Sequence, residues 1–358
     1  MNKGKEQSKK ILKIVLVSIV AFIMVIGLVA FVGFKSYIGK MNLVTETGKV
    51  DIIETVDPEE LDEVNASAGA VDASKEEVDT LEDQIRKNME ENSKTIKSDK
   101  DVLNILLIGS DTRTTGKSGR SDAMIVVSVN KNSKKIVATS LLRDIYLQIP
   151  GASNNRINAA FAYGGADLLM ETIKNNFKID IDRYVSIDFY AFMKVVDIVG
   201  GVNVKVTDKD ISIMNNYIKG LNSLTGSEVN KDLITSSGNL DLNGIQTLAY
   251  VRNRYIGTDF ARTSKQREVL EKVFNKVKGS NIIELNKILN TILPEVTTNL
   301  TEGEIFSLIL NVPAFSKYSI EQWSVPAEGT YNFLRIRGMD VIGIDFETNI
   351  TKLQDKIY

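Results

Sequence analysis

Charged residues stand at the ends of three short apolar segments within residues 101–144. The segments 102–108, 123–129 and 136–141 are rich in Ile, Leu and Val and have the length of buried strands. Loops at strand ends are where a rigid scaffold usually carries binding and catalytic groups. The charged residues at these ends are Asp111, Arg113, Arg120, Asp122, Arg143 and Asp144.

Carboxylates and guanidinium groups in one place suggest an anion held by Arg together with a hard cation held by Asp. An Arg side chain presents a planar fork that suits phosphate oxygens. Mg²⁺ is usually bound by one or two carboxylates together with substrate phosphates. The group as a whole therefore predicts a site for a phosphate-bearing ligand, whereas any single Asp–Arg pair is better explained as an ion pair on a solvated loop.

A second group of polar residues surrounds the start of a predicted helix. Arg252 and Arg254 are two residues apart, so they share a side only where the backbone is extended. Asp259 suits the N-cap of the following helix, and Arg262 and Gln266 lie one turn apart on its first turns. A helix N-terminus favours anions. The alternatives are capping alone for Asp259 and ordinary solvent exposure for Arg262 and Gln266.

The composition limits the possible chemistry. The chain of 358 residues has neither Cys nor His, and its formal net charge is −2. These absences exclude disulfides, thiolate chemistry, a Ser-His-Asp relay and His or Cys metal ligands. A metal would have oxygen ligands, which favours Mg²⁺, Mn²⁺ or Ca²⁺ over Zn²⁺. The near-neutral charge predicts no general affinity for nucleic acid.

The N-terminal third predicts a membrane anchor followed by a linker. Residues 1–13 include five Lys and predict a cytoplasmic basic tail, and residues 14–34 carry no charge and match the length of a transmembrane helix. Residues 35–100 are acidic and predict an extracellular stalk or linker. A narrow apolar stripe within it predicts one helix, interpreted as a spacer rather than a weak self-association seam; the stripe comprises Val78, Leu81, Ile85 and Met89.

Residues 101–358 predict one α/β domain. The polar segment 207–242 is weakly patterned and is interpreted as an insertion near the site, with a lid as one form it could take. Beyond the first three strands, apolar patterns predict strands at 184–187, 202–206 and 320–325 and helices at 166–177, 190–199, 243–250, 282–293, 302–311 and 346–357, together with the helix that begins near Asp259.

Several motifs within residues 102–275 resemble the LytR-CpsA-Psr family in order and spacing. The resemblance implies an α/β/α sandwich around a central mixed β-sheet. It also implies a membrane-anchored, extracellular phosphotransferase of Gram-positive type, with a single transmembrane helix and a cytoplasmic N-terminus. The motifs are IGSDTR, GRSDAMIVVSV, LLRDIYLQIPG, RINAAFAYGG, VDIVGGVNV and LAYVRNRYIGTDFARTSKQ.

The resemblance assigns roles to individual residues. Asp111 and Asp122 would be the ligands of Mg²⁺ or Mn²⁺. The implied phosphate- and substrate-binding residues are Arg120, Arg143, Arg156, Arg252, Arg254, Arg262 and Gln266. The implied catalytic residues are Asp122, Arg143, Arg252, Arg254 and Asp259.

The sequence departs from the family pattern in three places. Leu142 stands where Pro is frequent, and Arg156 stands where Lys is frequent. Lys265-Gln266-Arg267 replaces an Arg-Gln-Gln sequence, which leaves the roles of Lys265 and Arg267 open.

The expected reaction moves a glycopolymer of teichoic acid or capsular type from an undecaprenyl-pyrophosphate carrier to peptidoglycan. Asp122, Asp144 and Asp259 are the candidate general bases. The stretches 190–199 and 161–169 are expected to line an apolar cavity for the lipid, with plain core packing as the alternative. The alternative functions are pyrophosphate hydrolysis on the same lipid and a non-catalytic lipid-binding regulator of the cell envelope; no nucleic-acid partner is expected.

Overall fold

The computed structural model describes residues 33–44, 70–90, 96–110, 120–253, 259–279, 281–315 and 317–358. Residues 14–32 of the predicted membrane span, Asp111 and Arg254 lie outside this set, and for Asp259 only the backbone is described. No helix within the described ranges is both long and apolar enough to cross a bilayer.

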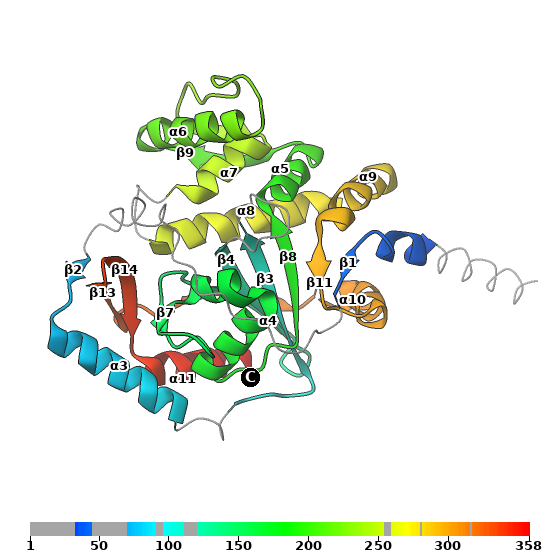
Figure 1. Ribbon diagram of the computed structural model, residues 1–358. Coiled ribbons are helices and arrows are strands. Elements are labelled where there is room, and N and C mark those ends of the chain that lie inside the picture. The colour runs from blue at the N-terminus through cyan, green and yellow to red at the C-terminus, as the bar shows by residue number, and fades with distance from the viewer. Residues whose placement is uncertain are drawn as a thin grey trace, which may run out of the picture.

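A mixed sheet of seven strands forms the centre of the molecule (Figure 1). The strand order is β1-β11-β8-β3-β4-β5-β12, with parallel pairs β1–β11, β8–β3 and β5–β12 and antiparallel pairs elsewhere. The strands are β1 (Asn42–Leu43), β3 (Val102–Ser110), β4 (Ser121–Asn130), β5 (Lys135–Leu141), β8 (Arg183–Asp188), β11 (Thr297–Thr298) and β12 (Ser319–Val325).

The two faces of this sheet serve different purposes because side chains alternate along each strand. Leu106 of β3 and Met124 of β4 point to a continuous hydrophobic core. Their neighbours Leu107 and Ile125 point to the opposite face, where they line a cavity. The predicted mixed sheet with flanking helices is therefore confirmed, and one sheet supplies both the main core and the cavity floor.

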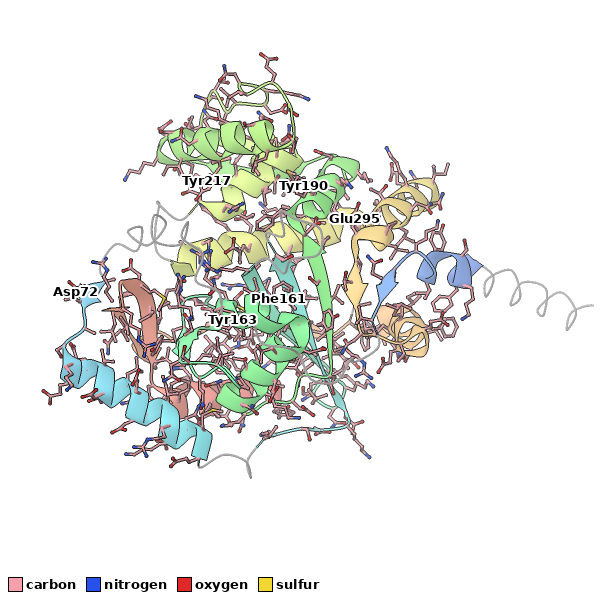
Figure 2. All side chains as sticks on the ribbon, viewed as in Figure 1. Asp72, Phe161, Tyr163, Tyr190, Tyr217 and Glu295 are labelled. Atoms are coloured by element: carbon pink, nitrogen blue, oxygen red, sulfur yellow. The ribbon has the colours of Figure 1, made fainter. Side chains whose placement is uncertain are left out.

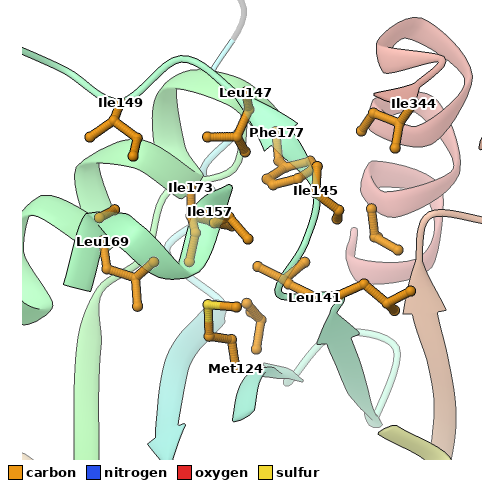
Figure 3. Packing of buried hydrophobic residues seen from close by; sticks show 14 of the residues in the cluster. Met124, Leu141, Ile145, Leu147, Ile149, Ile157, Leu169, Ile173, Phe177 and Ile344 are labelled. Carbon is orange, nitrogen blue, oxygen red and sulfur yellow. The ribbon is translucent and has the colours of Figure 1, made fainter. Parts of the chain in front are cut away.

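The core face is covered by α4 (Ile157–Phe177) and α11 (Phe346–Ile357). Figure 3 shows Ile157, Ile173 and Phe177 of α4 packed against the segment that follows β5. Helix α4 begins nine residues earlier than predicted and is kinked at Gly164 and Gly165, where the latter has φ +66°. The two glycines permit the kink, which explains why the sequence predicted only the second half as a helix.

The cavity face is covered by α5 (Phe189–Ile198), α7 (Gly244–Arg252), α8 (Asp259–Gly279) and α9 (Ile282–Ile292). Above them, β9 (Val202–Val206) pairs with β10 (Gly238–Leu242). Helix α6 (Asp208–Leu224) buries Met214 and Ile218 in this second core. The segment 207–242 thus contains a helix and a strand, because its few apolar residues have helical spacing between polar ones.

Part of the predicted linker packs on the domain. Helix α3 (Lys75–Glu90) buries Leu81 and Ile85 in the main core, and β2 (Val71–Asp72) joins the hairpin β13 (Tyr331–Ile336) and β14 (Met339–Ile344). The apolar stripe of this helix therefore faces the domain, in place of the spacer that its composition suggested. The remaining elements are β6 (Tyr146–Leu147), β7 (Asn155–Arg156), η2 (Leu293–Glu295) and α10 (Glu302–Phe315).

Candidate active site

A cavity of about 470 Å³ lies between the sheet and helices α5, α7, α8 and α9. Most of its wall is aliphatic or aromatic, with Leu107, Val185 and Phe192 among the lining residues. One part of the wall is polar instead and contains Asp122, Arg143, Arg252, Arg262 and Gln266. Such a cavity suits an amphiphilic ligand with an apolar chain and an anionic head.

Asp122 lies at the centre of the polar wall. It is the second residue of β4, and its Oδ1 accepts a hydrogen bond from the Arg143 guanidinium at 2.5 Å. Its Oδ2 lies 3.9 Å from the Arg252 guanidinium. Burial by itself would raise the pKa of the Asp122 carboxyl, but the charges of Arg143, Arg252 and Arg262 outweigh burial and lower it to about 2. Asp122 is therefore ionised at neutral pH.

Arg143 is held in place by a chain of buried ion pairs. Its Nε lies 3.6 Å from a carboxylate oxygen of Asp144, and Asp144 accepts a hydrogen bond from Arg156 at 3.2 Å. All three side chains are at least nine-tenths buried. The backbone is fixed as well, since the Ile342 amide of β14 donates to the Asp144 carbonyl at 2.8 Å. The position of the Arg143 guanidinium is therefore set before any ligand binds.

Arg252 stands at the end of α7 and is bordered by aromatic rings. Its guanidinium carbon lies 4.7 Å from the ring centre of Phe189 and 5.7 Å from that of Tyr217. Figure 2 shows Tyr217 on α6, above the helices that cover the cavity. A guanidinium favours the face of an aromatic ring, so these rings orient Arg252 while leaving its N–H groups available to an anion.

Helix α8 contributes both apolar and polar residues to the wall. Arg262 and Gln266 line the cavity from its first turns, and Leu270 and Val273 continue the same side further along. The spacing of three or four residues places all four on one face of the helix. The expected alternative of plain solvent exposure for Arg262 is wrong, since only 3% of this residue is exposed.

Comparison with known proteins now identifies the family. Residues 68–355 match the LytR_cpsA_psr family. The chain belongs to that family. It is 33% identical over 232 residues to the polyisoprenyl-teichoic acid–peptidoglycan teichoic acid transferase TagU of Enterococcus faecalis, an alignment that covers 63% of this chain and 71% of TagU.

Solved structures of family members show the same fold. The structure of TagT bound to LI-WTA has a TM-score of 0.58 and 28% identity, over 74% of this chain and 94% of that one. A second structure, of the family protein YwtF (TagT) with bound octaprenyl pyrophosphate lipid, has a TM-score of 0.54 and 27% identity, over 74% of this chain and 95% of that one.

The predicted site residues that the structure describes fall into two groups. The first lines the cavity and comprises Asp122, Arg143, Arg252, Arg262 and Gln266. The second comprises Arg120, which directly precedes β4, and Arg156 on β7, and neither is part of the cavity lining. Arg156 contacts Asp144, which lies beside Arg143. These contacts favour a positioning role for Arg156, and the expected phosphate contact stays a prediction.

The two expected lipid-lining stretches have different outcomes. Helix α5 supplies Phe192 and Val195 to the cavity, so the stretch 190–199 lines a mostly apolar cavity as predicted, and a lipid as its occupant stays a prediction. The prediction for 161–169 is wrong, because Phe161, Tyr163 and Leu169 are buried in the main core. Figure 2 shows Phe161 and Tyr163 on α4, well separated from Tyr217 and Tyr190. Both stretches are similarly apolar, so their composition does not show which face of the central sheet each helix covers.

Some residues at the site were not predicted. Asp188 at the end of β8 and Phe189 at the start of α5 line the cavity, and Asp188 also caps α5 by accepting from the Ala191 amide at 2.8 Å. Tyr217 comes from the segment that sequence patterning left without structure. The Asp-Phe pair after a predicted strand resembles a helix cap, which was the available signal for the first two residues.

The roles left open for Lys265 and Arg267 are answered by their contacts. Lys265 donates to Asp210 of α6 at 2.8 Å and lies 4.6 Å from the Tyr250 ring centre. Arg267 donates to the Ser140 hydroxyl at 2.7 Å, and burial lowers the pKa of its guanidinium. Both residues fasten α8 to neighbouring elements, and the cavity lining contains neither of them.

A divalent metal would find only part of its ligands among the described residues, where no three acidic side chains gather as a cation site. Asp122 provides the hard oxygen donors that Mg²⁺ prefers, and one of its oxygens accepts a hydrogen bond from Arg143. The second expected ligand, Asp111, lies outside the described residues. The donor chemistry therefore fits Mg²⁺ shared between carboxylates and substrate phosphates, as opposed to a site built by the protein alone.

Proposed function

We propose that this protein transfers a glycopolymer of teichoic acid or capsular type from a polyprenyl-pyrophosphate donor to peptidoglycan. The observation that carries the proposal is the cavity, whose wall is apolar except where three arginines converge. An undecaprenyl-pyrophosphate-linked glycan has the matching distribution of apolar chain and negative charge. The names of TagU and the lipid-bound YwtF structure support the same class of donor.

The proposed reaction is a displacement at phosphorus. The hydroxyl oxygen of the acceptor forms a bond to the phosphorus that carries the glycan, and the bond from that phosphorus to the bridging oxygen breaks. Prenyl phosphate leaves with the bonding electron pair, and the hydroxyl proton passes to a base. Negative charge therefore grows on the leaving phosphate and the phosphoryl oxygens.

The arginines supply the main stabilisation in this proposal. Arg143 and Arg252 approach the same carboxylate from two sides, so their guanidinium groups converge on one small volume. When a phosphate group enters this volume, the two guanidinium groups exchange contacts with Asp122 for contacts with the phosphate oxygens. Cations that are fixed in advance in a site of low water content stabilise developing charge without reorganising.

The geometry also reduces the number of candidate bases. Asp122 has a pKa of about 2, which makes it a weak proton acceptor at neutral pH. Asp144 is held between Arg143 and Arg156, behind the cavity wall. We therefore assign the role of base to Asp259, which begins α8. Asp122 then acts as the partner that orients Arg143 and Arg252.

We further propose that Mg²⁺ or Mn²⁺ is held by Asp122, Asp111 and the pyrophosphate. When bound, the ion would neutralise charge on the phosphate oxygens. The protein is proposed to be anchored by residues 14–34, with residues 1–13 in the cytoplasm and the domain outside the cell. No nucleic-acid partner is proposed, since the arginines of the site, Arg143, Arg252 and Arg262, lie in the wall of a cavity that is mostly apolar.

The test is a transfer assay with a short-chain prenyl-pyrophosphate glycan and a peptidoglycan oligomer. We expect prenyl phosphate to be released while the glycan becomes attached to the oligomer. Arg252→Lys keeps the charge but loses the planar fork that stacks on Phe189. It should lower kcat/KM about a hundredfold, or roughly 3 kcal/mol of transition-state stabilisation.

The matched control is Arg86→Lys on α3, whose side chain is 61% exposed and far from the cavity. It should leave the rate within twofold. If the glycan is found only free in solution, the reaction is hydrolysis and not transfer. If the protein binds the donor tightly but forms no product, the result supports the non-catalytic regulator alternative. Equal rates for Arg252→Lys and Arg86→Lys would remove Arg252 from the catalytic machinery.

A further inference from the structure

Helix α10 presents an apolar stripe to the outside of the molecule. Phe306, Ile309 and Leu310 are exposed to 44%, 53% and 64%, and Pro313 is exposed as well. The spacing of these residues, i, i+3, i+4 and i+7, places them on one face of the helix. A surface helix of a soluble domain normally turns such a stripe inward. We call these four residues the α10 stripe.

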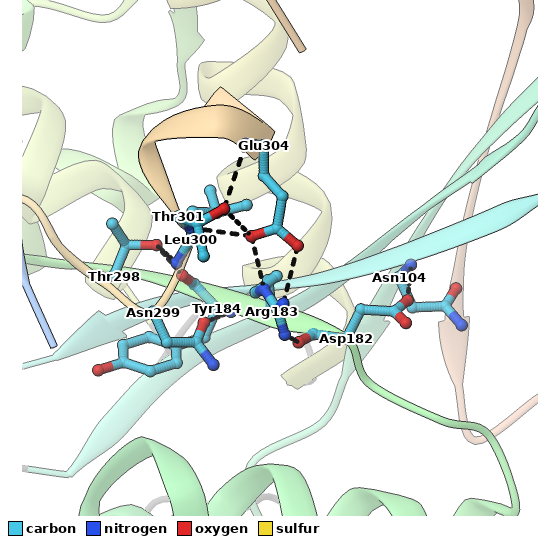
Figure 4. Close-up of polar contacts among 9 residues, drawn as sticks. All are labelled: Asn104, Asp182, Arg183, Tyr184, Thr298, Asn299, Leu300, Thr301 and Glu304. Atoms are coloured by element: carbon cyan, nitrogen blue, oxygen red, sulfur yellow. Dashed lines mark hydrogen bonds and ion pairs between the residues drawn. The ribbon is translucent and has the colours of Figure 1, made fainter. Parts of the chain in front are cut away.

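The inward side of α10 is fixed by polar contacts, which Figure 4 shows. Arg183 of β8 makes two contacts to Glu304, at 2.9 and 2.7 Å, and Glu304 also accepts from the Thr301 amide at 2.8 Å. Asn299, just before the helix, accepts from the Tyr184 amide at 2.8 Å. These contacts fasten the first turn of α10 to the sheet, with the stripe on the opposite side of the helix.

The start of the described chain lies against the stripe. The Phe34 ring packs edge-on against Phe306, with 5.1 Å between ring centres, and Lys35 forms an ion pair with Glu302. Ile38 is only 3% exposed, and β1 pairs with β11. Figure 1 shows this segment beside α10 and α9. Phe34, the last residue of the predicted membrane span, is therefore packed against the domain.

Helix α9 contributes to the same side of the molecule. Asn286 and Asn290 accept hydrogen bonds from Tyr37 and Lys40 of the N-terminal segment. Ile283 lies one turn before Asn286 on that face and is 78% exposed. Exposed apolar residues thus stand on both sides of the segment that would leave the membrane.

We propose that the α10 stripe lies in the outer surface of the lipid bilayer from which the N-terminal helix emerges. The inference rests on the membrane anchoring proposed above. The bilayer is the occupant that the contacts favour, because Phe34 joins the α10 stripe directly to the uncharged run 14–34. A membrane-bound helix of this kind buries its apolar face at the boundary between head groups and acyl chains.

This orientation gives the lipid donor a short path to the cavity. Helix α9 faces the proposed membrane side with Ile283 and lines the cavity with Ile288, Leu289 and Ile292. The prenyl chain would pass beside one helix on its way from the bilayer into the cavity, without crossing water. The proposal therefore deepens the transfer function by stating how the donor arrives.

The absence of Cys from the chain allows a direct test. We would place a single spin label in the full chain by Leu310→Cys, reconstitute it in phosphatidylglycerol vesicles, and measure collisions with oxygen and with a water-soluble nickel chelate. The control is Val229→Cys, at a residue that is 47% exposed in the segment after α6. We expect the label at 310 to favour oxygen at least threefold relative to the label at 229.

Equal access of the nickel chelate to both labels would overturn the proposal. So would spin–spin broadening at residue 310 that disappears on mixing with unlabelled chain, because a second copy would then cover the α10 stripe. Both readings are independent of enzyme activity, so they separate this proposal from the transfer function.

A second measurement tests the consequence for donor delivery. Leu310→Glu, which lies outside the cavity lining, should lower transfer at least tenfold from a long-chain donor embedded in vesicles. Transfer from a short-chain donor in solution should stay within twofold of wild type. Equal losses with both donors, or no loss with either, would contradict the proposal, and the depth measurement decides the case in which this variant does not fold.

Discussion

Replacing Asp122 by Asn tests how much the charge of this carboxylate contributes to folding. The pKa of Asp122 falls from 3.8 to about 2 in the folded protein, because three arginine charges outweigh the effect of burial. Each pKa unit corresponds to about 1.4 kcal/mol, so a fall from 3.8 to about 2 means that the ionised carboxylate stabilises the fold by about 2–3 kcal/mol at neutral pH. Asp122→Asn should lose about this amount, or slightly more if Arg143 is poorly compensated by Asp144.

The dependence on pH gives the prediction its sign. A carboxyl whose pKa is lowered by folding stabilises the protein above its unfolded pKa, and the contribution disappears as the pH falls through the folded value. The stability gap between wild type and Asp122→Asn should therefore be constant above about pH 5 and close as the pH falls from about 4 toward 2.

The assay is urea unfolding of a fragment that begins at residue 33, in EDTA, followed by the fluorescence of the single Trp. This residue, Trp323, is partly buried in β12 and donates to the Thr139 hydroxyl at 2.7 Å, so its emission should report unfolding. Asp355→Asn, at an exposed position on α11, is the control and should show no gap. A gap that is absent at pH 7, or that persists unchanged below pH 3, would refute the electrostatic account of Asp122.

Two further predictions concern packing and the base of α10. Gly244→Ala should destabilise the protein by about 2–4 kcal/mol in thermal unfolding, because an added Cβ would lie 2.3 Å from the Met193 carbonyl oxygen. The control is Gly220→Ala on α6, where an added Cβ meets no atom within 4 Å, and it should be neutral or slightly stabilising in the same measurement. The hydrogen bond from Arg183 lowers the pKa of Glu304 to about 2, so its support for α10 should be intact above about pH 5 and be lost as the pH falls toward 2. The protection factors of the α10 amides, which correct for the fall of the intrinsic exchange rate with pH, should decrease over that range in wild type and already be low at neutral pH in Glu304→Gln; equal protection factors in the two proteins at neutral pH would contradict this.

The parts of the fold that the sequence predicts are those with a strong period. The strands around Leu106 and Met124 and the helix around Val273 follow from apolar spacing alone. The hairpin β13–β14 was missed because polar residues interrupt its alternation, and α6 was missed because its core residues are few. Patterns of this kind report how each segment is buried, but they do not report which segments meet.

The same limit explains what was predicted of the site. Residue type and position at strand ends predicted Asp122 and Arg143 as neighbours, and the 2.5 Å contact between them agrees with that interpretation. No sequence pattern separates Arg156, which lies behind Asp144, from the arginines that line the cavity. Distance from the cavity depends on the packing of several elements at once, and no single segment encodes it.

The order of the strands in the central sheet has a consequence for folding during synthesis. Strands β3, β4 and β5 are neighbours in sequence and in space, so they are able to pair as soon as they are made. The outer edge of β5 cannot pair until β12, which begins at Ser319, has been synthesised. Likewise, β1 cannot pair until β11, which begins at Thr297, has been synthesised. Unpaired strand edges attract other chains, and contacts between distant segments form slowly. A chain emerging from the ribosome would therefore carry an open edge through most of its elongation, and a holding chaperone should bind it most strongly before residues 319–325 appear.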